Sequence, residues 1–169
     1  MAKLGIAIIG LGSAVQPHAR SLADLADRVD LRWGFSRTEA RRAAFARDYG
    51  APVSGDLDAV LGDLAVGAVL ILTPANAHLE IAEHAFAAGK HVLVEKPLDA
   101  TLDRAERLVA AGRAAGRRLG VVLQHRFRAG SLRLKERIAA GALGTIEAAS
   151  LAVPWWRPQS YYEIGRAHV

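Results

Sequence analysis

The chain has 169 residues, of which 51% are hydrophobic, and a net charge of +5, so it can bury one substantial core. It contains no apolar run of membrane-spanning length, no cleavable signal pattern and no cysteine for a disulfide framework or thiolate metal site. These features are typical of a cytoplasmic globular protein. Its arginines are scattered, without interleaved aromatic residues, which argues against nucleic-acid binding and leaves a solvated surface or a local anion site.

Strand and helix patterns alternate along the chain. Apolar runs predict strands over residues 3–9, 29–35, 52–54, 67–73, 91–94 and 118–124, and residues 145–153 begin another strand. Helices are predicted over residues 17–27, 38–49, 56–62, 77–89, 101–116 and 131–144. Because continuous apolar strands that alternate with helices form covered parallel sheets, we expect an α/β fold. It should be a doubly wound, Rossmann-type parallel sheet with strand order 3-2-1-4-5-6.

Two glycines, Gly10 and Gly12, separate the first predicted strand from the first predicted helix. The first allows a tight turn, and the second lets the backbone approach a pyrophosphate at the helix N-terminus. The third glycine position of this motif is Val15. The spacing predicts a nucleotide-binding loop, with a purely structural turn as the alternative; its residues are Gly10, Leu11, Gly12, Ser13 and Ala14.

The end of the second predicted strand bears on which nucleotide binds. NAD enzymes place an acidic residue there to hold the ribose hydroxyls, whereas this chain has Ser36, followed by Arg37, Arg41 and Arg42. A neutral hydroxyl next to a guanidinium suits a 2′-phosphate, which arginine binds bidentately. The pattern favours NADP, with NAD and ordinary helix-surface arginines as the alternatives.

Polar residues follow the fourth, fifth and sixth predicted strands. Because the carboxyl ends of parallel strands meet at one edge, we expect these residues to line one crevice beside the glycine loop. In chain order they are Thr73, Pro74, Asn76, His78, Glu95, Lys96, Gln124, His125 and Arg126. For His78 the alternative is a helix-capping or surface histidine. For Glu95 and Lys96 the alternative is a surface ion pair between the two side chains.

Four stretches together resemble the Gfo/Idh/MocA oxidoreductases, the glucose–fructose oxidoreductase and inositol dehydrogenase group. They are "GLG" after the first strand, "TPANAH", "EKPLD" and "QHRFRAGSLRLKERIAAGALG". The resemblance covers about residues 3–162, and "EKP" at that position is its most specific element. Val15 in the glycine loop and Ser36 in place of the usual acid depart from the family's pattern.

The resemblance implies a dehydrogenase or reductase that moves a hydride between a nicotinamide and a sugar- or polyol-like substrate. It implies that Lys96 is catalytic, beside the nicotinamide and the substrate oxygen, and that Glu95 orients the lysine or contacts the cofactor ribose. It also implies that Trp156 and Arg157 contact the cofactor, the alternative being an apolar patch that anchors a second domain. We expect no metal, and we expect the full-length parent to be a homo-oligomer.

The predicted dinucleotide-binding domain covers residues 1–124. Residues 125–163 are predicted to form a connecting helix and the first strand of an incomplete substrate domain. In the family that the chain resembles, that domain supplies an Asp-x-x-x-His pair. Residues 164–169, "IGRAHV", match the translation of a common sequencing adapter, so we interpret them as an adapter-derived tail, with a genuine short tail as the alternative. We therefore expect this chain to bind cofactor without turnover; the competing interpretations are a non-catalytic NAD(P)-binding module and an S-adenosylmethionine-dependent transferase.

Overall fold

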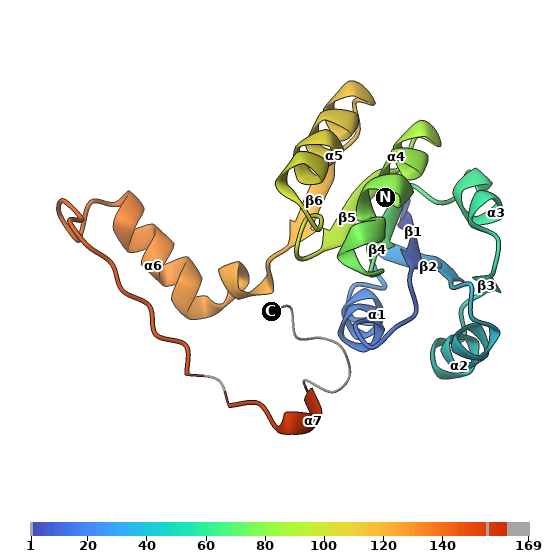
Figure 1. Ribbon diagram of the computed structural model, residues 1–169, viewed down its shortest axis with the longest axis horizontal. Helices are drawn as coiled ribbons and strands as arrows, with labels where there is room; N and C mark the ends of the chain where they lie inside the picture. Colours follow the sequence, from blue (N-terminus) through green and yellow to red (C-terminus); the bar gives the residue numbers. More distant parts are fainter. Residues whose placement is uncertain (1, 155, 162–169) are drawn as a thin grey trace. The chain divides into compact units, whose positions relative to one another are not determined.

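The computed structural model describes residues 2–154 and 156–161 (Figure 1). The chain divides into two compact units, residues 1–124 and 125–169. That residues 1–124 form a dinucleotide-binding domain with this boundary stays a prediction. That the second unit begins a larger substrate domain stays a prediction. The proposed adapter-derived tail, residues 164–169, lies outside the described residues. None of the described helices is both long and apolar enough to cross a membrane.

The first unit contains one sheet of six parallel strands in the order β3-β2-β1-β4-β5-β6. This confirms the predicted Rossmann-type topology. The strands are β1 (Leu4–Ile9), β2 (Val29–Phe35), β3 (Val53–Ser54), β4 (Ala68–Ile71), β5 (His91–Glu95) and β6 (Leu119–Val122). The helices between them are α1 (Val15–Asp24), α2 (Glu39–Tyr49), α3 (Leu57–Gly62), α4 (His78–Ala87) and α5 (Leu102–Ala114), with a short 3₁₀ turn, η1 (Ala75–Ala77), before α4.

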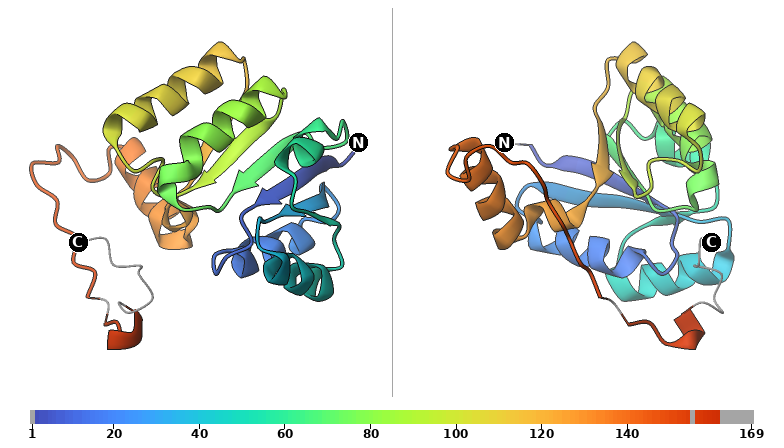
Figure 2. Two further views of the ribbon diagram at one scale, coloured as in Figure 1. Left: turned by 45° about the vertical axis from the view of Figure 1, so that its right-hand side comes forward. Right: turned by 60° about the vertical axis from the view of Figure 1, so that its left-hand side comes forward.

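The two faces of the sheet are covered by different helices (Figures 1 and 2). Successive side chains of a strand point to opposite faces, so Ile9 packs in a cluster with side chains from α3, α4 and α5, whereas Ile8 packs with Phe45 of α2. Both isoleucines are fully buried. This two-sided burial explains why the strands read as continuous apolar runs.

Helix ends follow local rules. Asp56 caps α3 by accepting hydrogen bonds from two backbone N–H groups, and Thr101 caps α5 by accepting from the Arg104 N–H. α1 begins at Val15, two residues before the predicted start. Pro17 is therefore its third residue, where the missing N–H costs no hydrogen bond because the first N–H groups of a helix have no partner within it.

Lys90, just before β5, holds Asp63, which lies in the segment between α3 and β4. The Lys90 side chain is buried, and its Nζ donates to the Asp63 carbonyl at 2.9 Å. The Asp63 carboxylate accepts from the Trp33 indole and the Ala65 N–H, each at 2.8 Å. These bonds hold the pKa of Asp63 below its usual 3.8, and the bond from Trp33 has the largest effect.

A buried carboxylate joins α4 to the chain that follows β5. Asp99 accepts hydrogen bonds from the Leu79 N–H, the Ala100 N–H and Arg104 Nε, the last at 2.6 Å. Arg104 also binds both oxygens of Glu80 and thereby lowers the pKa of Glu80 to about 2. Burial by itself raises the pKa of Asp99, but the hydrogen bonds from Arg104 and the two amides outweigh it and hold this pKa below 3.8.

The second unit contains α6 (Ala129–Ala139), the short α7 (Gln159–Tyr161) and, at its junction with the first unit, the 3₁₀ turn η2 (Gln124–Phe127). Residues 145–153, predicted as a strand, form no strand here. A strand needs a neighbour for its backbone hydrogen bonds, and the described part of this unit contains no other strand. Their pairing within a larger sheet stays a prediction.

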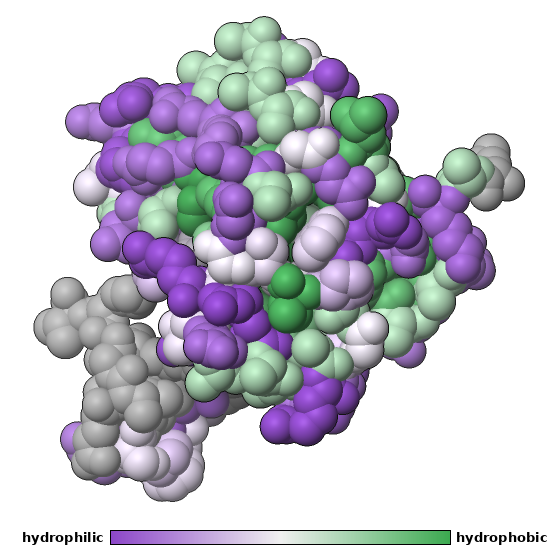
Figure 3. All heavy atoms as spheres, turned by 90° about the vertical axis from the view of Figure 1, so that its right-hand side faces the viewer, coloured by the Kyte–Doolittle hydropathy of each residue, from purple (hydrophilic) through white to green (hydrophobic). Residues whose placement is uncertain are grey.

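Figure 3 shows the face that carries α2 and α3, where hydrophilic residues are spread over the surface and are not confined to one area. This distribution agrees with a mostly solvated exterior for the charged side chains.

We predict that Asp99→Asn destabilises the protein by about 2–3 kcal/mol, because an amide cannot replace a carboxylate that accepts three hydrogen bonds, one of them charge-assisted. Since the folded-state pKa of Asp99 is lowered, its contribution is fully present above the unfolded-state value of 3.8 and is lost as the pH falls through the folded-state value. Urea unfolding at several pH values measures both effects.

The control for this prediction is Arg107→Ala. Arg107 and Glu83 also join α5 to α4, but at 3.5 Å and with 65% and 42% of their side chains exposed. That variant should change the free energy of unfolding by less than about 0.5 kcal/mol. An equal loss for both variants would contradict the role assigned to Asp99.

Candidate cofactor and active site

The glycine loop joins β1 to α1. Gly10 has φ +103°, and a Cβ there would lie 2.9 Å from the backbone of Leu72 and Thr73, so a side chain at this position is excluded on two grounds. A Cβ on Gly12, in contrast, would meet no atom within 4 Å in the described structure. The first glycine is required by the protein itself, and the second leaves open space beside the loop.

The remaining loop residues differ in how far they are buried. Leu11 is buried in the core, Ser13 is exposed and Ala14 is half-buried. No side chain caps the N-terminus of α1 in the described structure, and its first turn has no acidic residue. The Val15 N–H already donates to the Gly12 carbonyl at 3.1 Å, and Pro17 has no N–H, so Gln16 supplies the N–H in the first three positions of α1 that can still bind an anionic group.

Ser36, the residue that follows β2, is buried. Its hydroxyl accepts from the Thr38 N–H at 3.2 Å, and its carbonyl accepts from Arg42 Nη1 at 2.7 Å. Arg42 thus holds the backbone of this turn, whereas Arg37 and Arg41 are exposed. Sequence reasoning grouped the three arginines, but the structure separates one backbone-binding arginine from two that face solvent.

The chain after β4 contains an unpaired polar atom. Thr73 Oγ1 is buried and has no hydrogen-bond partner among the described residues, and Thr73 Cγ2 would contact a Cβ placed on Gly10. Pro74 and Asn76 are exposed. The Thr73 hydroxyl is a buried donor next to the glycine loop that the chain itself leaves unsatisfied.

His78, predicted to contact a cofactor, is buried with only 1% of its surface exposed. Its Nε2 lies 2.9 Å from the Thr73 carbonyl and its Nδ1 lies 3.2 Å from the Leu98 carbonyl. The ring therefore joins the chain after β4 to the chain after β5. A direct contact with a cofactor stays a prediction for this residue.

β5 ends at Glu95, and Lys96 and Pro97 follow it, joined by a cis peptide bond. The Glu95 carboxylate accepts from the Lys96 backbone N–H through Oε2 and from His18 Nε2 through Oε1, each at 2.9 Å. Lys96 is exposed, and its ammonium forms no ion pair within the described part of the chain. The predicted alternative of a surface ion pair between these two side chains is therefore wrong.

Sequence analysis assigned no role to His18. Its pairing with Glu95 spans 77 positions, which no local pattern reveals. One indication was available: His18 lies in the helix that follows the glycine loop, and this helix and Glu95 lie at the same edge of a parallel sheet.

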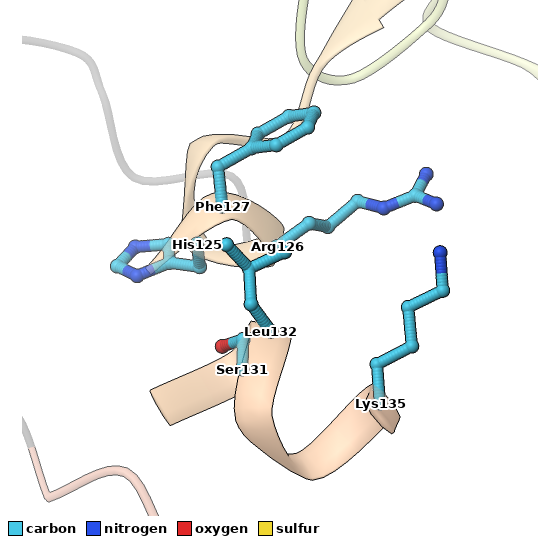
Figure 4. Close-up of a pocket in the computed structure, with 6 residues that line it drawn as sticks. All are labelled: His125, Arg126, Phe127, Ser131, Leu132 and Lys135. Carbon is cyan, nitrogen blue, oxygen red and sulfur yellow. The ribbon is translucent and has the colours of Figure 1, made fainter. Parts of the chain in front are cut away.

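The other predicted contacts lie at or beyond the junction of the two units. Gln124, His125 and Trp156 are exposed and Arg157 is half-buried. The second unit contains an open pocket of about 410 Å³. In Figure 4 the Arg126 and Lys135 side chains, which line it, extend to the same side. A cofactor contact by Gln124, His125, Trp156 or Arg157 stays a prediction. In the described part of the chain, no three His, Asp or Glu side chains gather as they would around a metal ion.

Comparison with known proteins decides which family these features belong to. Residues 4–123 match the model of an oxidoreductase family with an NAD-binding Rossmann fold, GFO_IDH_MocA. The chain belongs to the Gfo/Idh/MocA oxidoreductase family. It spans 29–42% of the length of the curated relatives that it matches.

Relatives and solved structures support this assignment. The scyllo-inositol 2-dehydrogenase (NADP(+)) IolW of Bacillus subtilis is 30% identical over 91% of this chain and 42% of its own length. The WlbA dehydrogenase of Bordetella pertussis, solved with NADH and UDP-GlcNAcA, superposes with a TM-score of 0.90 at 30% identity, over 96% of this chain and 50% of that one. A scyllo-inositol dehydrogenase of Lactobacillus casei, solved with NAD(H) and scyllo-inositol, superposes with a TM-score of 0.79 at 26% identity, over 86% of this chain and 43% of that one.

The chain fits the dinucleotide that its family binds. The space beside Gly12, the uncapped N-terminus of α1 and the unpaired Thr73 hydroxyl all lie around one loop. A pyrophosphate in that space could accept hydrogen bonds from backbone N–H groups of the glycine loop and from the Gln16 N–H in the first turn of α1.

We predict that an alanine substitution at Gly10 mainly affects stability, whereas one at Gly12 mainly affects cofactor binding. Gly10→Ala should destabilise the protein by about 2–3 kcal/mol through backbone strain and contact with the chain after β4. Gly12→Ala should leave unfolding within about 0.5 kcal/mol of wild type but weaken NADPH binding, since its methyl group occupies the open space. Thermal unfolding and fluorescence titration distinguish the two; strong cofactor binding by the Gly12 variant would contradict the placement of the site.

Proposed function

We propose that the parent protein is an NAD(P)-dependent dehydrogenase or reductase that acts on a sugar- or polyol-like substrate. The observation that carries the proposal is Lys96, an exposed ammonium at the end of β5 whose neighbouring carboxylate is engaged elsewhere. A nicotinamide bound to this domain supplies the hydride acceptor or donor. The named substrates of the relatives, scyllo-inositol and UDP-GlcNAcA, support the hydroxyl-rich substrate class.

In this proposal the chain's own residues bind and orient. Gly10 turns the loop, with its N–H bonded to the Phe35 carbonyl. The backbone of Leu11, Gly12, Ser13 and Ala14 holds the pyrophosphate, and the Thr73 hydroxyl binds a polar atom of the cofactor. Lys96 donates a hydrogen bond to the substrate oxygen and stabilises negative charge as it develops there. Because no carboxylate neutralises Lys96 within the described residues, its full charge is available for that role.

The second part of the proposal is a preference for NADP over NAD. Ser36 carries no charge that would repel a 2′-phosphate, and Arg37 and Arg41 are exposed beside it. The NADP(+)-dependent relative from Bacillus subtilis supports this preference, whereas the two solved structures hold NADH and NAD(H). NAD remains the alternative cofactor.

We predict that Arg37→Ala weakens NADPH binding by about 1.5–3 kcal/mol, as expected for the loss of a charge-assisted hydrogen bond, and changes NADH binding little. Titration of each cofactor by fluorescence measures the difference. The control is Arg47→Ala at the other end of α2, where Arg47 pairs with Asp48 in solvent. Equal losses for both cofactors would show that Arg37 does not contact the 2′-phosphate.

The same site leads to a prediction for the 169-residue chain itself. It should bind NADPH weakly and show no turnover with sugars or polyols, because Lys96 is exposed and solvent screens its effect on a developing charge. Absorbance at the nicotinamide band, followed with a panel of sugars and polyols, measures turnover. Sugar oxidation by the purified chain would contradict the expectation that a second domain completes the site; tight cofactor binding without turnover even in the longer parent would favour a non-catalytic NAD(P)-binding module.

A further inference from the structure

A single side-chain bridge connects the helix after the glycine loop to the end of β5. His18 of α1 lies with Nε2 2.9 Å from Glu95 Oε1, and the two side chains are only 16% and 19% exposed. A carboxylate accepts hydrogen bonds and does not donate them, so His18 Nε2 carries the proton and donates. Partial burial protects this bond from the competition with water that weakens most surface pairs.

Both oxygens of Glu95 are engaged in this arrangement. Oε1 accepts from His18, and Oε2 accepts from the backbone N–H of Lys96. A carboxylate next to an ammonium in the sequence would ordinarily attract it. Here the carboxylate is held on one side by an imidazole and on the other by a peptide, and the Lys96 ammonium remains without a carboxylate partner among the described residues.

We propose that His18 is a positioning residue for Lys96, and that it acts through Glu95. By holding Oε1, the imidazole keeps the carboxylate turned toward the Lys96 peptide and away from the Lys96 ammonium. The bridge also joins the helix that would bind the pyrophosphate to the strand end that carries the lysine. The importance of this positioning for catalysis rests on the proposed function, but the His18–Glu95 bridge itself can be tested without a cofactor.

The chain provides a matched control. His84 of α4 lies 3.0 Å from Asp58 of α3, which makes a second histidine–carboxylate pair in the first unit. Its side chains are 49% and 77% exposed, and neither residue adjoins a residue of the candidate site. Replacing His84 therefore removes a similar pair without touching Lys96.

The first experiment observes the Lys96 amide by NMR in the purified 169-residue chain. His18→Leu should move the Lys96 amide proton upfield and speed its exchange with water about fivefold to tenfold, because Glu95 is no longer held against it. His18→Gln, which places an N–H donor near the position of Nε2, should restore most of both properties, and His84→Leu should change neither. The proposal is overturned if the chemical shift and exchange rate of the Lys96 amide proton stay unchanged in His18→Leu. It is also overturned if they change in His18→Leu and His18→Gln does not bring them back toward the wild-type values.

The second experiment measures NADPH binding in a double-mutant cycle. If His18 acts through Glu95, His18→Leu should weaken binding about threefold to tenfold. The double variant with Glu95→Leu, which cannot accept a hydrogen bond, should bind no more weakly than Glu95→Leu alone. Additive losses would overturn the proposal. If wild type binds neither NADPH nor NADH, the proposed function fails, whereas the Lys96 amide still decides whether His18 positions this residue.

Discussion

The parallel pairing of β1 with β2 on one side and β4 on the other is the constraint on which the candidate site depends. The pairing continues past the strand ends: the Gly10 N–H donates to the Phe35 carbonyl, and the Leu72 N–H donates to the Ile9 carbonyl. Because the three strands run in the same direction, the glycine loop, Ser36 and Thr73 follow strands that end at one edge of the sheet. Residues far apart in the sequence are therefore brought to the same edge of the sheet, where the candidate site is proposed.

Side-chain contacts hold the loops at that edge, and the side chains that make them differ in how far they are buried. Asp99, with three donors and no exposed side-chain surface, anchors the chain after β5 to α4. His78 joins the same segment to Thr73 through two carbonyls. His18 adds a partly exposed bridge to Glu95. Fully buried groups thus support the backbone, while the less buried groups lie next to the atoms proposed to meet cofactor and substrate.

The sequence predicted the topology because apolar strand runs, helix caps and the glycine pair are local patterns, each readable within a few residues. It did not predict what His78 and His18 contact, because their partners are 5, 20 and 77 positions away and depend on how loops pack. For Glu95 and Lys96 the sequence left a surface ion pair open as the alternative to a catalytic lysine, and only the contacts of Glu95 with His18 and the Lys96 N–H exclude that pair. The segment 145–153 has the composition of a strand, but strand formation requires a neighbour that composition alone does not supply.

The burial of Lys90 has a consequence for chemical labelling. The lysines of this arginine-rich chain are Lys3, Lys90, Lys96 and Lys135, and the Lys90 amine is buried against the Asp63 carbonyl. Amine-directed reagents react with accessible, unprotonated amines, so the native fold removes one of these few targets. Lys96 thus belongs to a very small set of modifiable amines, and mass spectrometry can follow its accessibility residue by residue while cofactors or sugars are added.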